Sequence, residues 1–317
     1  MQAIMIHYLA RRVILSLVTV IGAAVLSFLL VHLTPGTPGQ LILGAGASQQ
    51  QIEALNNKIG WNEPLVSQMT HYLSGALRGD LGTSIIDGHS IGPDLSSRLA
   101  ITGTVAALAT LTSAIFGVLV GVLCAVRGGV TDRVINAANG MALSAPPFWI
   151  GVVLVYLFAV EANVFPATGY VSPMDSLPGW LSSITLPVVA LAIPGIAIVA
   201  RTARVATIQA LAQPHIQMLR SMGTPPWRVL FVHVLRSASV PVVSVLGMQF
   251  VAVFTGSIII EGLFGLPGLG QAASTAVTYH DFPAVVGVVI VASLAVVLVN
   301  LALDVLVVLL DPRVRLA

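Results

Sequence analysis

Six long intervals without Asp, Glu, Lys or Arg constrain the fold of this chain more than any other feature. They are residues 13–52, 99–126, 134–160, 176–200, 237–260 and 282–303. Each is longer than the roughly 20 residues that an α-helix needs to cross the hydrocarbon core of a bilayer. In the first interval the apolar part is 13–33, which prolines and glycines follow. The sequence therefore predicts an all-α membrane protein with six transmembrane helices.

Composition supports this class of protein. Only 8% of the residues are charged, against about 25% in an average soluble domain. The one cysteine, Cys124, excludes a disulfide framework and a cysteine metal cluster within the chain. The first apolar run is longer than the roughly 7–15 residues of a signal-peptide core, so we expect a retained helix.

The positions of the basic residues predict the orientation. If both termini are cytoplasmic, all but three of the 14 lysines and arginines face the cytoplasm, which agrees with the positive-inside rule. The three exceptions are Lys58, Arg78 and Arg98. A further uncharged stretch, 262–280, contains four glycines and a proline, and a seventh span would export the C-terminal arginines. We expect this stretch to be a re-entrant or interfacial segment on the outer side.

These assignments divide the chain into three parts. They are the N-terminus with the first span (1–33), an extracytoplasmic region with short helices (34–98), and a five-span core (99–317) that includes a cytoplasmic loop (201–236). In the outer region, Ser48 and Gln51 form a capping-box pattern, and a second helix is expected between Pro64 and Gly79. The two short helices either cap the bundle or dock a soluble partner.

The cytoplasmic loop contains "QPHIQMLRSMGTPPWRVLFVHVLRS" at 213–237. Pro214 suits a helix start and Gly223 a helix stop, while Thr224 and Pro225 resemble the cap and first residue of another helix. The first helix is too short to be stable alone and needs a surface to pack against. Met218 and Met222 suit an adaptable apolar contact with a partner protein. The alternative is that the basic loop lies on anionic lipid headgroups.

Several motifs follow one another in a fixed order. They are "LTPGTP" after the first span, "GDLGTS" at 79–84, "EGLFGLPGLG" at 261–270, "YHDFP" at 279–283 and "LLDPRVR" at 309–315. With these motifs the chain resembles the first permease of the dipeptide and oligopeptide group of binding-protein-dependent ABC importers, nearly from end to end.

The resemblance implies a fold and a set of partners. The fold is the type I ABC importer permease, in the plasma (inner) membrane of a prokaryote. The partners are a homologous second permease, two cytoplasmic ABC ATPases, an extracytoplasmic substrate-binding protein and the lipid bilayer, with no nucleic acid. The mechanism is alternating access. Peptides are the implied cargo, but similar permeases carry nickel, glutathione and other small solutes.

The resemblance also assigns the loop helix to coupling with an ATPase. The family's motif glycine falls on Gly223, and the contact is expected to be dominated by Ile216, Leu219 and Met222. The wider importer pattern has an acidic residue followed by two alanines where this chain has Gln217, Met218 and Leu219. The coupling residues implied in this way are His215, Ile216, Gln217, Leu219, Arg220, Gly223, Trp227 and Arg228.

Catalytic motifs do not fit this sequence. A phosphate-binding loop needs a Gly-Lys pair, but the chain's one lysine, Lys58, follows Asn57. ATP and magnesium are therefore expected on the partner ATPases, and no cofactor or metal is expected here. The seven histidines lack ligand spacing, and neither H-E-x-x-H nor G-x-S-x-G occurs, which argues against a membrane protease or lipid enzyme. His32, near the outer end of the first span, is expected to be an interfacial residue.

Two features of the apolar runs bear on transport. Asp304 is the one acid inside an apolar run, and an intramembrane acid is a functional candidate by default. Its position near the cytoplasmic end favours structural pairing, while an ion-coupled secondary transporter is the alternative reading. Pro187 and Pro194 predict a kinked or loosened fourth span that leads into the loop.

Overall fold

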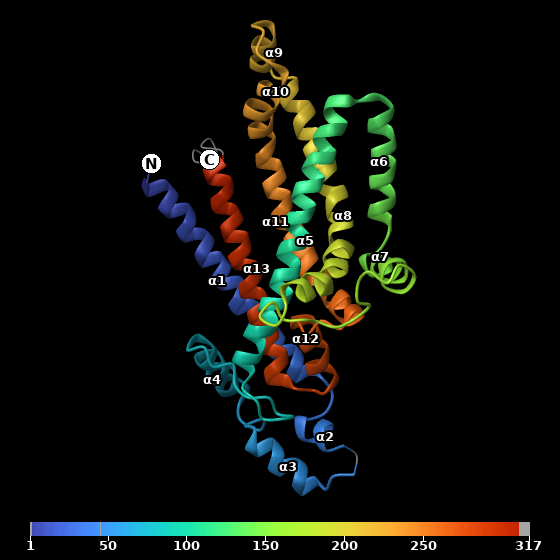
Figure 1. The fold of residues 1–317 in the computed structure, drawn as a ribbon. Coiled ribbons are helices and arrows are strands. Elements are labelled where there is room, and N and C mark those ends of the chain that lie inside the picture. Colours follow the sequence, from blue (N-terminus) through green and yellow to red (C-terminus); the bar gives the residue numbers. More distant parts are fainter. Residues whose placement is uncertain (1, 45, 311–317) are drawn as a thin grey trace. The chain divides into compact units, whose positions relative to one another are not determined.

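The computed structural model describes residues 2–44 and 46–310, and these are nearly all helical (Figure 1). Within that part of the chain the one β-type pairing is an isolated bridge between Thr83 and Ser90. The predicted all-α class is confirmed. The arginines at 313 and 315, which end the "LLDPRVR" motif, lie outside the described residues.

Five stretches among the described residues are long and apolar enough to span a membrane, and a bent helix pair is a sixth candidate. The helices in the five stretches are α1 (Gln2–Leu33), α5 (Ile91–Arg127), α8 (Leu177–Leu211), α11 (Leu235–Phe264) and α13 (Phe282–Leu310). All five match predicted spans, although α5 begins eight residues before the predicted interval at 99 and therefore starts inside region 34–98. Five of the six predicted spans thus correspond to continuous candidate spans, and the sixth corresponds to the bent pair.

The third predicted span, 134–160, is not one straight helix. In its place are α6 (Gly129–Ser144), α7 (Pro147–Leu154) and the π-helix η1 (Val155–Glu161), and the two halves are bent by 100°. Proline disfavours the helical conformation of the residue before it. Pro146 therefore keeps Ala145 extended at φ −86° and ψ 124°, and Pro147 keeps Pro146 extended at φ −63° and ψ 142°. The Pro-Pro pair thus ends α6 and turns the chain.

The described chain forms two compact units, which we describe separately. The first contains residues 103–266 and 298–310 with a short N-terminal piece, 2–6. The second contains residues 7–102 and 267–297. The second unit therefore brings the predicted outer region, 34–98, together with α12 (Leu269–Thr278) and the start of α13.

Helix α8 is the centre of the first unit. It packs against α6, α7 and α11, and two glycines of α5 let that helix approach α8 closely. A Cβ added at Gly121 would lie 2.4 Å from the Ala200 carbonyl oxygen, and one at Gly117 would lie 2.6 Å from the Val199 Cβ. Helix α8 continues through both Pro187 and Pro194, so it is not broken there, and a kink stays a prediction.

Short helices build much of the second unit. They are α2 (Pro38–Leu43), α3 (Gln49–Lys58), α4 (Leu65–Leu77) and α12. The predicted capping box of Ser48 and Gln51 is confirmed, because each side chain accepts a hydrogen bond from the other residue's backbone N–H. Helix α2 was not predicted, although Thr37 and Gln40 cap it in the same way. Helix α12 has only 10 residues, which agrees with the expectation that 262–280 is not a seventh span.

Candidate functional site

The predicted coupling segment connects α8 to α11 in the first unit (Figure 1). It contains α9 (Pro214–Ser221), α10 (Pro226–Arg228) and the π-helix η2 (Val229–Val234). The predicted first helix is confirmed. The second begins one residue later than predicted, and Pro225, not Thr224, is its N-cap. The cause is Pro226, which keeps Pro225 extended at φ −57° and ψ 137°.

Gly223 ends α9 in a Schellman turn. Its N–H donates to the Arg220 carbonyl at 3.0 Å, and the Thr224 N–H donates to the Leu219 carbonyl at 3.1 Å. Gly223 has a φ of +77°, a value that L side chains rarely adopt. No atom lies within 4 Å of the position of an added Cβ. The requirement for glycine at 223 is therefore set by the backbone and not by crowding.

Ile216 anchors α9 to the rest of the first unit. It is only 1% exposed and lies in a buried apolar cluster with Ala210 of α8 and with Val229 and Val234 of η2. Leu219 is half-buried against the same cluster. The expectation that Ile216 dominates a contact with a partner is therefore corrected, because the chain's own core already covers it.

The opposite face of α9 is exposed. Met218 is 64% exposed and Met222 70%, and Trp227 in α10 is 64% exposed. Gln217 is also exposed, and its amide nitrogen donates to the Ala212 carbonyl at 3.3 Å. We call the following exposed residues, which are the candidates for contact with a partner protein, the docking face: His215, Met218, Arg220, Met222, Trp227 and Arg228.

Sequence reasoning overlooked Phe231, which is 64% exposed in η2. Its spacing of four residues from Trp227 was the available signal, since residues i and i+4 share one face of a helix. An exposed aromatic pair at this spacing extends the apolar part of the segment beyond the two methionines.

An ion pair between α6 and α8 was also overlooked. Arg204 donates through Nε and Nη2 to the two carboxylate oxygens of Asp132, both at 2.5 Å. Asn136 donates to Asp132 at 2.7 Å, so the carboxylate has several partners. A two-pronged arginine–carboxylate pair fixes orientation as well as distance. It ties α6 to the part of α8 that leads into α9.

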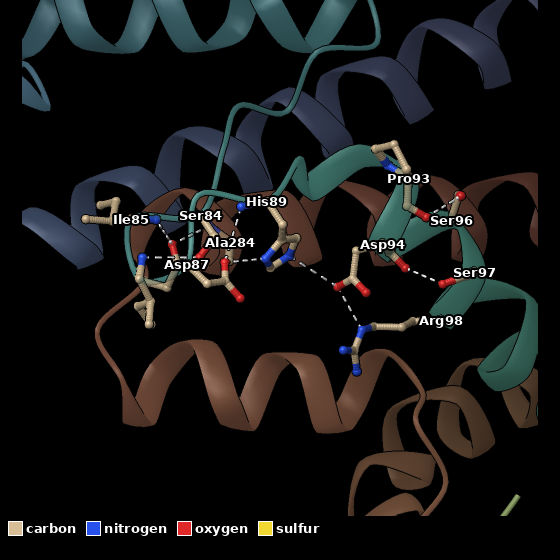
Figure 2. Close-up of polar contacts among 12 residues, drawn as sticks. Ser84, Ile85, Asp87, His89, Pro93, Asp94, Ser96, Ser97, Arg98 and Ala284 are labelled. Carbon is tan, nitrogen blue, oxygen red and sulfur yellow. Dashed lines mark hydrogen bonds and ion pairs between the residues drawn. The ribbon is translucent and has the colours of Figure 1, made fainter.

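In the second unit, Asp281 joins two of the sequence motifs. Its carboxylate accepts from Ser84 Oγ at 2.5 Å, from the Ile85 N–H at 3.4 Å and from the Ala284 N–H at 3.5 Å, and Asp281 is 4% exposed. Figure 2 shows Ser84, Ile85 and Ala284, the three residues that donate to Asp281, close together. The "GDLGTS" and "YHDFP" motifs therefore meet around one buried acid.

Tyr72 adds a second link to the same place, because its hydroxyl donates to the Pro283 carbonyl at 3.2 Å. Burial, together with the nearby carboxylates of Asp281 and Asp80, raises the pKa of Tyr72 far above its usual value. The tyrosine is therefore a neutral donor at any physiological pH.

A row of charged side chains, formed by Asp87, His89, Asp94 and Arg98, lies beside Ser84 (Figure 2). His89 Nδ1 contacts the Asp87 carboxylate, His89 Nε2 lies 3.7 Å from Asp94, and Arg98 Nε donates to Asp94 at 2.8 Å. The hydrogen bond from the His89 side chain lowers the pKa of Asp87. The row borders a cavity of about 300 Å³. Across residues 2–44 and 46–310, no group of three His, Cys, Asp or Glu is arranged to hold a metal ion.

Asp304 lies half-buried in α13. The residues of the coupling segment lie together on α9, α10 and η2. Asp304 is separate from them in sequence and lies on a different helix. Its predicted structural pairing stays a prediction.

Comparison with known proteins gave matches along nearly the whole chain. A family model described as the inner membrane component of binding-protein-dependent transport systems matches residues 117–316, and the model of the N-terminal part of such membrane components matches residues 5–110. A probable peptide ABC transporter permease of Sinorhizobium fredii is 34% identical over 309 residues, which cover 97% of this chain and 99% of that protein. The glutathione transport system permease of Escherichia coli K12 is 32% identical over 312 residues, which cover 98% and 99%.

Among solved structures, a chain of the MetNI methionine ABC transporter in an inward-facing conformation is similar, with a TM-score of 0.55 and 19% identity. The match covers 68% of this chain and 96% of that chain. At this level of identity the likeness establishes the fold alone.

Proposed function

Because the chain belongs to the family of inner-membrane components of binding-protein-dependent transport systems, we propose that it is a peptide permease driven by ATPases that dock on α9. The chain is a multi-pass membrane permease subunit of an ABC importer with a type I permease fold. The proposal concerns its cargo, its partners and the residues that couple them.

The proposed cargo is a di- or oligopeptide. The similarity to a probable peptide permease extends over 97% of the chain, and that to a glutathione permease over 98%. Glutathione is itself a small peptide, so the two relatives point to one class of solute. Glutathione is the second candidate, on the strength of that relative's name.

The proposed partners follow from the family's dependence on a binding protein. They are a soluble binding protein on the outer side, a homologous second permease and two ATPases on the cytoplasmic side, with both termini of this chain cytoplasmic. The ATPases bind ATP and magnesium, and this chain binds neither. Alternating rocking of the two permeases opens the path for the solute.

The exposed docking face on an internally anchored helix is the observation that carries the coupling role. Ile216 fixes α9 to α8 and η2, so a push on α9 moves the adjoining spans together. Met218 and Met222 offer an adaptable apolar surface, and Arg220 and Arg228 add positive charge at its edge. Force applied to the docking face is thus delivered to α8 and α11.

Uptake of labelled solutes tests the cargo. A strain lacking this chain, with and without the chain restored, is offered a labelled dipeptide, a labelled oligopeptide and labelled glutathione. Restoration of peptide uptake supports the proposal, and restoration of glutathione uptake alone supports the second candidate. Restoration of neither, with the chain present in the membrane at normal abundance, contradicts both.

A further inference from the structure

Helix α6, the first half of the broken span, has no buried residue, although it packs along α8 (Figure 1). The chain enters α6 through Gly128 and Gly129, whose φ values of +60° and +62° are ones that L side chains rarely adopt. It leaves α6 through the Pro146–Pro147 pair. Both ends of α6 are therefore turns, and its position against α8 depends on partly buried contacts between the two helices.

The ion pair of Asp132 and Arg204 joins the start of α6 to α8. The guanidinium donates to both carboxylate oxygens at 2.5 Å, and Asn136 donates to the same carboxylate from the next turn of α6. The side chains of Arg204 and Asp132 are only 29% and 17% exposed. Salt screens partly buried pairs less than exposed ones, and a two-pronged pair fixes orientation as well as separation.

Helix α5 approaches α8 closely at the same level. A Cβ added at Gly121 would lie 2.9 Å from the Arg204 backbone nitrogen and 2.8 Å from the Ala203 Cβ. Helices α5 and α6 therefore form a hairpin, and each of its arms contacts α8 near Arg204. The α5 arm does so through a close backbone approach, and the α6 arm through the ion pair.

Arg204 lies on the part of α8 that leads to the docking face. Helix α8 ends at Leu211 and α9 begins at Pro214, about 15 Å along the chain from Arg204 at 1.5 Å per helical residue. The prolines inside α8 both lie before this part of the helix. Ile216 packs α9 against Ala210 of α8. Because rigid helices and packed side chains carry coupling, displacement of α9 reaches Arg204.

We propose that the Asp132–Arg204 pair is a clamp that makes α6 move with α8, so that a push on α9 reaches the broken span. Without the clamp, α8 still moves with α9, but α6 is free to turn about its glycine and proline ends. Asp132 and Arg204 are thus positioning residues, which act through the helices that they join. The role of the clamp in transport rests on the proposed function, whereas its hold on α6 does not.

A distance between two spin labels, measured by electron–electron resonance on the full chain in lipid bilayers, tests the hold on α6. The labels are attached to cysteines at the exposed positions Met141 of α6 and Gln209 of α8, in a Cys124→Ala background. They lie about 20 Å apart along the helix axes. We expect one narrow distance peak in the wild type and loss of that peak in Arg204→Gln.

Two further variants separate the clamp from a general loss of charge. Asp132→Arg combined with Arg204→Asp restores the pair with its charges exchanged, and it should recover the narrow peak. Arg98→Gln is the matched control and should leave the peak unchanged. Arg98 is also 29% exposed and pairs with an aspartate, Asp94, but both residues lie on α5, so their pair joins no two helices.

The complete complex in proteoliposomes tests whether the clamp serves transport, with a labelled dipeptide as the solute. The quantity measured is dipeptide taken up per ATP hydrolysed. Residues between coupled sites change coupling by a factor of roughly 2–30, so we expect Arg204→Gln to lower the ratio by such a factor while the ATPases stay bound and active. Arg98→Gln should keep the wild-type ratio, and the exchanged pair should recover most of it.

Three results would overturn the proposal. They are a distance peak in Arg204→Gln as narrow as that of the wild type, a peak in the exchanged pair as broad as that of a broken pair, and an unchanged uptake ratio when the pair is broken. Lack of dipeptide uptake by the wild-type complex would contradict the proposed function instead. The spin-label distances need neither ATPases nor solute, so they decide the hold on α6 in that case too.

Discussion

Two short helices, α9 and α12, end in the same hydrogen-bond pattern but with different residues in the left-handed position. Helix α9 ends at Gly223 with a φ of +77°, and α12 ends at His280 with a φ of +58°. In α12 the His280 N–H donates to the Val277 carbonyl at 3.3 Å and the Asp281 N–H to the Ala276 carbonyl at 2.8 Å, the same Schellman pattern as in α9.

The surroundings explain why α12 tolerates a histidine. Its start is fixed where Thr102 Oγ1 accepts from the Leu269 N–H at 2.8 Å, and the buried Asp281 carboxylate fixes the chain just after its end. Backbone strain persists where neighbouring contacts determine the conformation. Helix α9 has no side-chain cap at its start, and its turn is exposed. Its geometry therefore depends on glycine, and its free face is open for another molecule.

The largest effect is expected from Gly223→Val. A β-branched residue in the left-handed region costs about 1–2 kcal/mol, and relieving this strain changes the angle between α9 and the helix that follows it. We expect solute uptake to be abolished and co-purification of the ATPases to weaken, while membrane insertion is unchanged. Gly223→Asn is the matched control, because asparagine tolerates this conformation, and it should keep most of the uptake. Uptake by Gly223→Val equal to that of the wild type would show that the turn after α9 does not depend on glycine, so that it would not differ from the turn after α12.

Asp281→Ala should act through stability and not through coupling. It leaves Ser84 and two backbone N–H groups without their acceptor in a buried place. An unsatisfied buried group costs about 1–3 kcal/mol, so we expect a lower thermal midpoint of the purified chain. Asp281→Asn, which keeps one acceptor oxygen, should be milder. An unchanged midpoint in Asp281→Ala would show that α12 and α13 do not depend on this acid.

Arg220→Glu on the docking face should have a smaller effect. It reverses one exposed charge, and such charges contribute about 0.2–1 kcal/mol, so uptake should fall by a factor of roughly 1.4 to 5. Arg78→Glu reverses an exposed charge in the second unit and is the control for net charge. A similar loss of uptake in both variants would show that the change in net charge, and not a change in docking, causes the loss.

The smallest effect concerns Asp87. Because its pKa is lowered in the folded chain, its contribution to stability is present above the unfolded value of about 3.9 and is lost as the pH falls through the folded value. The difference in thermal midpoint between the wild type and Asp87→Asn should therefore shrink as the pH is lowered from 6 to 3. A difference that grows with acidification would contradict the assigned His89 contact.

The predictable parts of the fold follow from local physical rules. A bilayer demands long apolar helices, so charge-free runs located α1, α5, α8, α11 and α13. Proline and glycine located both ends of α9. The bend after α6 was missed, although the Pro146–Pro147 pair carried a local signal, because an uninterrupted apolar run was read as one helix.

Other features depend on tertiary contacts that spacing cannot show. Ser84 and Asp281 are 197 residues apart, so nothing local to either predicts their hydrogen bond. Ile216 and Leu219 are three residues apart, a spacing that puts two side chains on one face of a helix. Spacing does not tell whether that face meets a partner or the chain's own core, and it meets the core.

Cysteine protection tests the central claim, that α9 docks an ATPase by its exposed face. Single cysteines at Met218, at Met222 and, as a control, at Gln49 on α3 are placed in a Cys124→Ala background. We expect a thiol reagent to label all three in the purified chain, and the added ATPases to protect the two on the docking face while leaving the one at 49 reactive. Equal labelling at 218 and 222 with and without ATPases that demonstrably bind the chain would place the coupling contact elsewhere.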